Sequence, residues 1–282
     1  GLIKTYLRYI KHVQDTDGKL YNLVSKEKIV DKKSWGEEAH GRAINALGFL
    51  TSMQIIPKEI KLEAEDILVQ ALNVANEIHA PRAISSVISG LYYYNKENYS
   101  GTTIKIIRKF AEELIQLYQE NKTNDWRWFE QELTYANSKI CESLFYSYML
   151  SQNEKYLEAA KESLNFLISK TFENGIFVPI GQNGWYKKGG KRAYYDQQPI
   201  DVASMVQTLT LAYKLTKDLD YEKKALAAFQ WFLGKNTLNQ VVYNETTGGC
   251  YDGLDKKDAN LNQGAESTLE YFLARLTLDE VV

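Results

Sequence analysis

The chain has 282 residues, with 34 Lys and Arg against 36 Asp and Glu, and a formal net charge of −2. This near balance argues against a nucleic-acid-binding protein, whose affinity for phosphates comes from an excess of basic residues. No run of about 18 apolar residues occurs, and the first residues lack the order of a secretory signal, so we expect a cytoplasmic protein that does not enter a membrane. We expect one domain over residues 1–282, long enough to bury a large core.

The first residue is Gly1, and the absence of a Met before it indicates a piece of a longer chain. The two cysteines, Cys141 and Cys250, are too few for a disulfide framework and lack the spacing of metal ligands. The three His also lack such spacing. We therefore expect neither a metal ion nor an organic cofactor.

The first half of the chain predicts helices of two kinds. Residues 2–13 form a short amphipathic pattern, and an irregular stretch leads to a helix that opens at 36–38. Residues 62–78 carry apolar side chains at three- and four-residue steps, as in a surface helix. Pro81 then opens a helix rich in Ser, Ala and Gly, a composition that allows close packing on several sides.

The same alternation continues in the second half. Further helices are expected over 104–119, 138–150, 154–169, 200–215, 221–232 and 265–276. Short pieces of strand are expected near 175–179 and 240–243. One-faced helices alternate with helices that are apolar on most sides, which predicts an all-α fold of five helical hairpins. We expect an α/α toroid, with an inner barrel and an outer ring, in which a sixth hairpin comes from upstream sequence or from the irregular early segment.

In a toroid, the loops that lead into the inner helices lie at one end, so polar residues far apart in sequence converge there. Four such loops, 35–42, 125–137, 184–198 and 248–267, each carry both carboxylates and aromatic residues. The whole chain is rich in aromatic residues, with 20 Tyr, 10 Phe and 5 Trp. Aromatic faces beside amides and carboxylates suit sugar rings, which stack on the ring and hydrogen-bond through their hydroxyls.

The segment 194–205 places Asp196, Gln197 and Gln198 just before Pro199, which is comfortable at the first position of a helix. Helix N-termini present unpaired N–H groups and a positive dipole end, so these polar side chains form a natural site for a hydroxyl-rich or anionic ligand.

Four segments carry a resemblance to a known family: 35–42, 126–137, 195–199 and 248–267. They are similar to the α/α-toroid domains of the six-hairpin glycosidase type that occur with bacterial glycosyltransferases and mannoside-processing enzymes. The resemblance covers most of the chain and implies an oligosaccharide ligand, with a glycosyltransferase domain as a partner. It implies no particular reaction.

Glycoside hydrolysis needs two carboxyl groups, about 5 Å apart for retention and about 6.5 to 9.5 Å apart for inversion. The resemblance to toroid hydrolases favours inversion, and we expect Glu38 and Asp196 to act as acid and base. Glu130, Asp252 and Glu266 are alternative carboxylates. The remaining residues expected to hold or stack on a sugar are Glu37, His40, Arg42, Trp126, Trp128, Tyr135, Asn137, Trp185, Tyr195, Gln197, Gln198, Asn262 and Gln263.

Each assignment has a structural alternative. Glu37 and Glu38 can complement the helix dipole, and Asp196 can cap its helix. Asp252 lies between turn-forming residues, Glu266 can bond loop amides, and His40 can be structural. The Trp residues can anchor a core, although flanking Asp, Arg, Glu and Asn argue against this. The basic tip 187–192 is expected to be a solvated loop, with contact to a phosphate or an acidic sugar as the alternative.

Three functions compete on this reading. A glycoside hydrolase that acts on short oligosaccharides is favoured. A non-catalytic sugar-recognition domain would use the same cleft without a working acid and base. An isoprenoid cyclase also uses an α/α toroid, but it requires an apolar, Asp-rich cavity, and the amide-rich loops count against it.

Overall fold

The structure is a computed structural model that describes residues 1–280. Its helices are α1 (Leu2–His12), α2 (Glu37–Ser52), α3 (Lys58–Ala71), the 3₁₀ helix η1 (Leu72–Glu77), α4 (Pro81–Glu97), α5 (Gly101–Asn121), α6 (Ser138–Ser151), α7 (Glu154–Thr171), α8 (Pro199–Thr216), α9 (Leu219–Phe229) and α10 (Ala265–Asp279). Its strands have two residues each: β1 (Glu132–Leu133), β2 (Phe172–Glu173), β3 (Ile176–Phe177), β4 (Tyr186–Lys187), β5 (Tyr243–Asn244), β6 (Gly249–Cys250), β7 (Gly253–Leu254) and β8 (Ala259–Asn260).

Every helix expected from the sequence is present, and most begin within a few residues of the expected position. Pro81 and Pro199 are the first residues of α4 and α8, as predicted, because the fixed φ of proline suits this position and its missing N–H removes no helical bond. The chain divides into two compact units, Gly1–Ile115 with Tyr146–Tyr156, and Gln116–Phe145 with Leu157 onward. The expectation of one domain stays a prediction.

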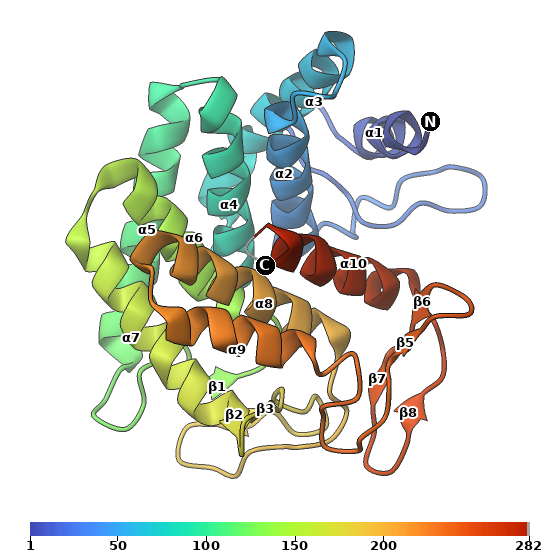
Figure 1. The fold of residues 1–282 in the computed structure, drawn as a ribbon. Helices are drawn as coiled ribbons and strands as arrows, with labels where there is room; N and C mark the ends of the chain where they lie inside the picture. The colour runs from blue at the N-terminus through green and yellow to red at the C-terminus, as the bar shows by residue number, and fades with distance from the viewer. Residues whose placement is uncertain (281–282) are drawn as a thin grey trace. The chain divides into compact units, whose positions relative to one another are not determined.

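In the first unit, α4 packs so closely against α2 that the two backbones are in contact (Figure 1). A Cβ atom at Gly48 would lie 2.0 Å from the Gly90 carbonyl oxygen, so the small residues of the sequence serve this contact. Twelve of the 17 residues of α4 are buried, whereas α3 buries one face of five residues. The predicted difference between an enclosed and a one-faced helix is therefore confirmed for α4 and α3, whereas α2, with six of its 16 residues buried, is less enclosed than expected.

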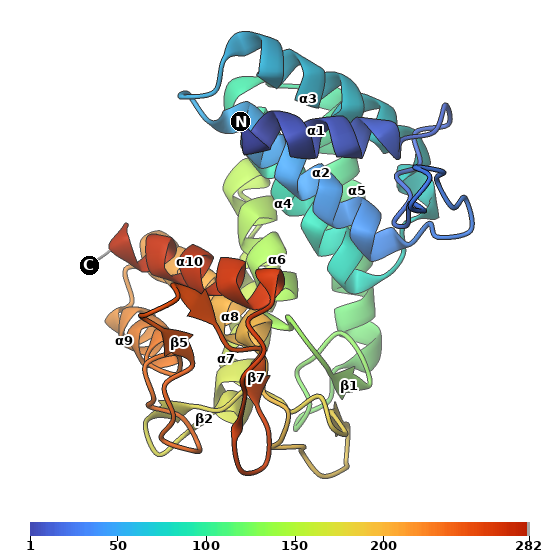
Figure 2. The same cartoon turned by 90° about the vertical axis from the view of Figure 1, so that its right-hand side faces the viewer.

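In the second unit, α8 packs against both α9 and α10 (Figure 2). Eleven of its 18 residues are buried, whereas α9 buries only Tyr221, Ala225, Ala228 and Phe229. The strands pair antiparallel as β1–β4, β2–β3, β5–β6 and β7–β8. The strand expected near 175–179 is β3, but the one expected at 240–243 contributes only the start of β5 and one bridge from Val241 to Leu233. Within residues 1–280, no helix is long and apolar enough to cross a bilayer.

Candidate functional site

The predicted site residues fall into both units. Glu37, Glu38, His40 and Arg42 belong to the first unit, and all the others belong to the second. Glu38 lies one helical turn from Arg42, with 3.7 Å between its Oε2 and Arg42 Nη2. Both side chains are partly exposed.

The Glu37 carboxylate ties α2 to the segment that precedes α4. Its Oε2 accepts the N–H groups of His79 and Ala80, at 2.6 Å each. Ala80 is the N-cap residue of α4 and its own side chain cannot cap the helix. Glu37 therefore supplies an acceptor near a positive helix end. The Glu37 carboxylate is therefore engaged in hydrogen bonds within the protein.

His40 is buried and both of its ring nitrogens are engaged. The Leu20 N–H donates to Nδ1 at 3.3 Å, so the proton lies on Nε2, which donates to the Ala71 carbonyl at 3.0 Å. Burial lowers the pKa of the imidazole below its ordinary value. The expectation that His40 donates to a sugar hydroxyl is wrong, because neither nitrogen is open to a ligand.

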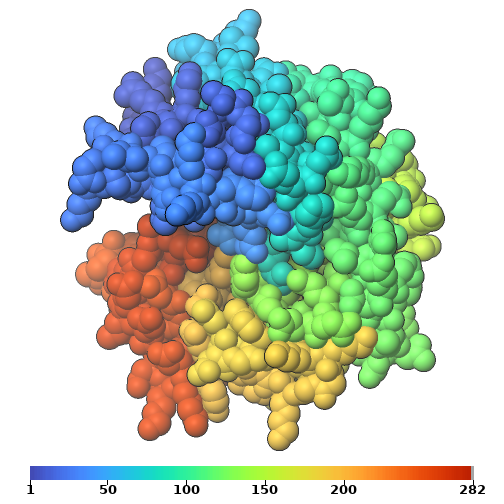
Figure 3. All heavy atoms as spheres, turned by 180° about the vertical axis from the view of Figure 1, so that it is seen from behind, coloured from blue at the N-terminus to red at the C-terminus, as the bar shows by residue number. Residues whose placement is uncertain are grey.

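Three loops of the second unit are joined by backbone hydrogen bonds. Strand β1 pairs with β4, with Leu133 opposite Tyr186, so the 122–137 segment lies against residues 179–198, which we call the site loop (Figure 3). Gln197 and Leu254 exchange both of their N–H···O bonds, at 2.9 Å each, and join the end of the site loop to β7. Residues from three predicted loops are therefore brought together, as expected.

The site loop presents Trp185 in a strained conformation. Trp185 has φ of +53°, which is rare for a bulky residue and costs about 1–3 kcal/mol. Its N–H donates to the Gly181 carbonyl at 3.1 Å, and its own carbonyl accepts the Ala193 N–H at 2.9 Å. Its half-buried ring lies 6.1 Å from the ring of Tyr135, centroid to centroid. These two rings form an aromatic pair at the surface of the loops.

Asp196 also has a positive φ, of +62°. Its carbonyl accepts the Gln182 N–H at 2.9 Å, but its half-buried carboxylate forms no hydrogen bond or ion pair with any residue in the described part of the chain. It does not cap α8, whose N-cap residue is Gln198. Gln198 instead donates its amide N–H to Gln182 Oε1. The fold thus fixes the backbone of Asp196 and makes no use of its carboxylate.

The carboxylate of Asp252 makes hydrogen bonds within the loop that leads into α10. It accepts the Gly264 N–H at 2.8 Å, the Ser267 hydroxyl at 2.7 Å and the Asn262 amide at 2.5 Å. Burial alone would raise the pKa of Asp252, but these three donors outweigh it and hold the pKa below its ordinary value. Asp252 and Asn262 therefore fix the loop.

Burial corrects the expectation for three further residues. Trp126 and Trp128 are 2% and 0% exposed, so neither indole face is open for a sugar to stack on. Trp126 donates to the Glu130 carbonyl at 2.8 Å and packs edge-on against Phe166 and Tyr186. Gln197 is 1% exposed; it donates to Tyr194 and Thr237 and accepts from Trp231.

The other predicted residues of this unit lie nearer the surface, except Asn137. Asn137 is buried and exchanges hydrogen bonds with the backbone of Thr134. Tyr195 is 44% exposed, with Lys256 Nζ 5.3 Å above its ring. Gln263 accepts the Thr247 hydroxyl at 2.6 Å. Glu266 is exposed in the first turn of α10, and Glu130 is half-buried.

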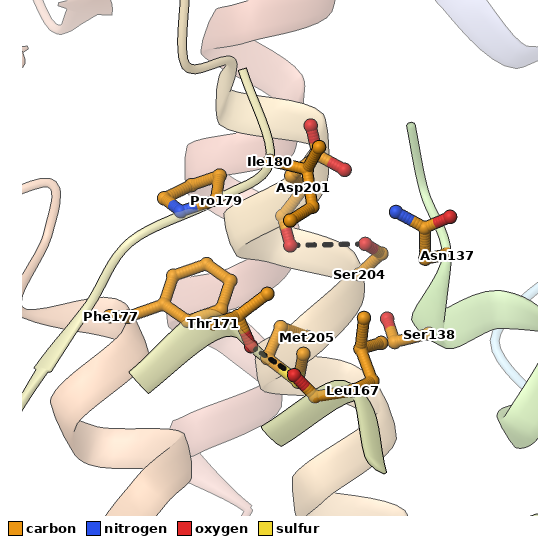
Figure 4. Close-up of a pocket in the computed structure, with 10 residues that line it drawn as sticks. All are labelled: Asn137, Ser138, Leu167, Thr171, Phe177, Pro179, Ile180, Asp201, Ser204 and Met205. Carbon is orange, nitrogen blue, oxygen red and sulfur yellow. Dashed lines mark hydrogen bonds between the residues drawn. The ribbon is translucent and has the colours of Figure 1, made fainter. Parts of the chain in front are cut away.

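A small cavity lies below the start of α8 (Figure 4). Its volume of about 10 Å³ has room for about one water molecule, which is too small for a sugar ring. Asp201 and Ser138 line it, and the Ser138 hydroxyl is buried with no hydrogen-bond partner among residues 1–280. Asp201 also accepts the Ala136 N–H at 2.8 Å. Asp201 is not among the residues predicted from the sequence, although an acidic residue in a first helical turn is a recognisable signal.

The sequence analysis also misjudged Arg192, which was expected in a solvated loop tip. Its side chain is 9% exposed and lies among backbone carbonyl oxygens. No pattern in the sequence distinguishes it from the exposed Lys187 and Lys191 nearby. Among residues 1–280, no group of three His, Cys, Asp or Glu side chains is placed to hold a metal ion.

No protein-family model and no curated protein sequence matches the chain. It is similar in structure to an unsaturated glucuronyl hydrolase specific for heparin, at 14% identity and a TM-score of 0.70, over 99% of this chain and 78% of that one. It is similar to a D-mannose isomerase at 14% identity and a TM-score of 0.71, over 98% and 80%. A cellobiose 2-epimerase from Bacillus thermoamylovorans B4167 matches at 12% identity and a TM-score of 0.71, over 96% and 78%. These likenesses confirm the predicted all-α, α/α-toroid fold and the resemblance to six-hairpin glycosidase-like structures.

Proposed function

We propose that this chain is a carbohydrate-active enzyme, a glycoside hydrolase that acts on short oligosaccharides. The observation that carries the proposal is the unused carboxylate of Asp196 on the site loop, which also carries Trp185 of the Trp185–Tyr135 aromatic pair. The pair offers a surface on which a sugar ring can stack, and Asp196 offers a group that can exchange a proton. The names of the similar structures, which describe sugar-acting enzymes, support the substrate class.

Proton transfer in the second unit would rest on carboxylates. The three His of the chain are His12, His40 and His79, and all belong to the first unit. Hydrolysis requires a second carboxyl group besides Asp196, and inversion requires about 6.5 to 9.5 Å between the two. Glu266 is an exposed candidate in the same unit. Glu38, the partner expected from the sequence, belongs to the first unit and stays a prediction.

A thermal-shift screen against mono- and oligosaccharides, followed by product analysis, tests the proposal. A ligand at about 100 times its Kd stabilises the fold by roughly 2.7 kcal/mol, which corresponds to a shift in Tm of about 5 °C. We expect an oligosaccharide to bind and to yield new reducing ends. Binding without products would favour the non-catalytic sugar-recognition domain, and the absence of any sugar binding would overturn the proposal.

A further inference from the structure

We propose that Arg192 is the positioning residue that holds Trp185 in place for sugar recognition, an inference that rests on the proposed function. Arg192 lies seven residues after Trp185 in the site loop, at the point where the loop returns to its own beginning. The Ala193 carbonyl accepts the Gly181 N–H at 3.0 Å, and the Ala193 N–H donates to Trp185. Whatever fixes residues 192–193 therefore also fixes the backbone of Trp185.

The guanidinium of Arg192 joins three separate pieces of backbone. Nη1 donates to the carbonyl of Lys170, in the last turn of α7, and Nη2 donates to the carbonyls of Val178 and, at 3.1 Å, Pro179. One side chain thus connects the end of α7, the beginning of the site loop and its return. A planar fork with several donors can satisfy acceptors in these different directions at once.

Glu173 and Tyr194 hold the guanidinium itself. Nη1 donates to Glu173 Oε1 at 2.7 Å, and the Tyr194 hydroxyl donates to the same oxygen at 3.2 Å. The Arg192 Cζ atom lies 4.6 Å from the centroid of the Tyr194 ring. The charge is therefore paired and stacked although the side chain is nearly buried, which is the environment that arginine tolerates better than lysine.

The conformation of Trp185 explains why such a clamp is needed. Its positive φ is unfavourable for a bulky residue and persists only where the surroundings enforce it. At the tip of the loop, β1–β4 pairing and the bond from Lys188 Nζ to the Asn121 carbonyl, at 2.7 Å, provide one anchor. Arg192 provides the anchor at the base. Without it, we expect Trp185 to relax away from Tyr135.

The test is the Arg192→Lys variant, which keeps the charge and loses the fork. Incorporation of 5-fluorotryptophan gives a ¹⁹F NMR signal for each of the five Trp, and Trp185→Phe identifies the signal of Trp185. We expect Arg192→Lys to shift or broaden that signal and to leave those of the buried Trp126 and Trp128 in place. Lys191→Ala, which removes an exposed charge next to Arg192, is the matched control and should move none of them.

Sugar affinity provides the second readout. Arg192→Lys should weaken binding about tenfold, which is also the effect we expect of Trp185→Ala. The double variant should bind no more weakly than Trp185→Ala alone, because both changes remove the same interaction between Trp185 and the sugar. If Arg192→Lys fails to fold, Glu173→Gln should shift the same ¹⁹F signal to a smaller extent. A folded Arg192→Lys protein with an unchanged Trp185 signal, or with all five signals shifted alike, would overturn the proposal. The NMR measurement needs no sugar, so it decides the role of Arg192 even if the proposed function fails.

Discussion

The first turns of α2 and α8, one helix in each unit, make the same kind of hydrogen bond. Glu37, the first residue of α2, accepts the N–H groups of His79 and Ala80, which precede α4. Asp201, the third residue of α8, accepts the N–H of Ala136, which precedes α6. In each unit, an acid in the first turn of one helix accepts a hydrogen bond from the segment that precedes another helix. These two acids are structural.

The two helix starts differ in the residues that precede the helix. Asp196 comes before the N-cap residue of α8, outside the helix, and its carboxylate is not used by the fold. The carboxylates of Glu37 and Asp201, inside the first turn, accept backbone N–H groups of other segments, whereas the carboxylate of Asp196, before the cap, accepts no hydrogen bond from the described residues. We therefore expect Asp196, and not the other two acids, to serve a ligand.

Substitution of the two kinds of acid should separate their roles most strongly. Asp196→Asn should lower turnover about 10³-fold, within the range for loss of a general acid or base, and should leave stability nearly unchanged. Glu37→Gln should lower the free energy of unfolding by about 1–3 kcal/mol, because it weakens two hydrogen bonds to a charged group, and should leave the turnover of folded protein intact. Initial rates and urea titrations measure both quantities.

Asp201→Asn is the control within the second unit. It should behave as Glu37→Gln does, although it lies five residues from Asp196 in sequence. Turnover that survives in Asp196→Asn would remove that residue from the mechanism. A loss of turnover in all three variants would show that the comparison of the two helix starts is mistaken.

Trp126 and Trp185 allow the same comparison between a residue of the core and a residue of the proposed site. Trp126→Ala should destabilise the protein by about 3–5 kcal/mol, because it leaves a large cavity in the core. Trp185→Ala should weaken sugar binding about tenfold and cost little stability, because it removes a half-buried ring. Calorimetric titration with a sugar and thermal unfolding provide the two measurements. Equal losses of stability would contradict the assignment of Trp185 to the site.

The sequence was sufficient for the helices, because apolar spacing and the two helix-initiating prolines mark their boundaries locally. It was not sufficient for the role of Trp126 and Trp128. Their neighbours Asp125 and Arg127 are charged, which argued for exposure, but successive side chains in an extended segment point in opposite directions. Asp125 is exposed and Arg127 pairs with Glu162, while both indoles point inward. Which side faces the core depends on contacts with α7 and β4, and these are distant in sequence.

His40 gives the smallest effect and tests the first unit alone. Its folded-state pKa is depressed below 6.5, chiefly by burial, so above that pH the ring is neutral in both the folded and the unfolded chain. As the pH falls below about 6.5, the imidazole of the unfolded chain binds a proton and that of the folded chain does not. The free energy of unfolding therefore falls by at most about 1.4 kcal/mol per pH unit. Urea titrations between about pH 5 and 7.5 should show this slope in the wild type and in His79→Gln, and a shallower slope in His40→Gln. Equal slopes in all three proteins would mean that His40 accepts a proton within the fold, which requires the Leu20 N–H bond to Nδ1 to break.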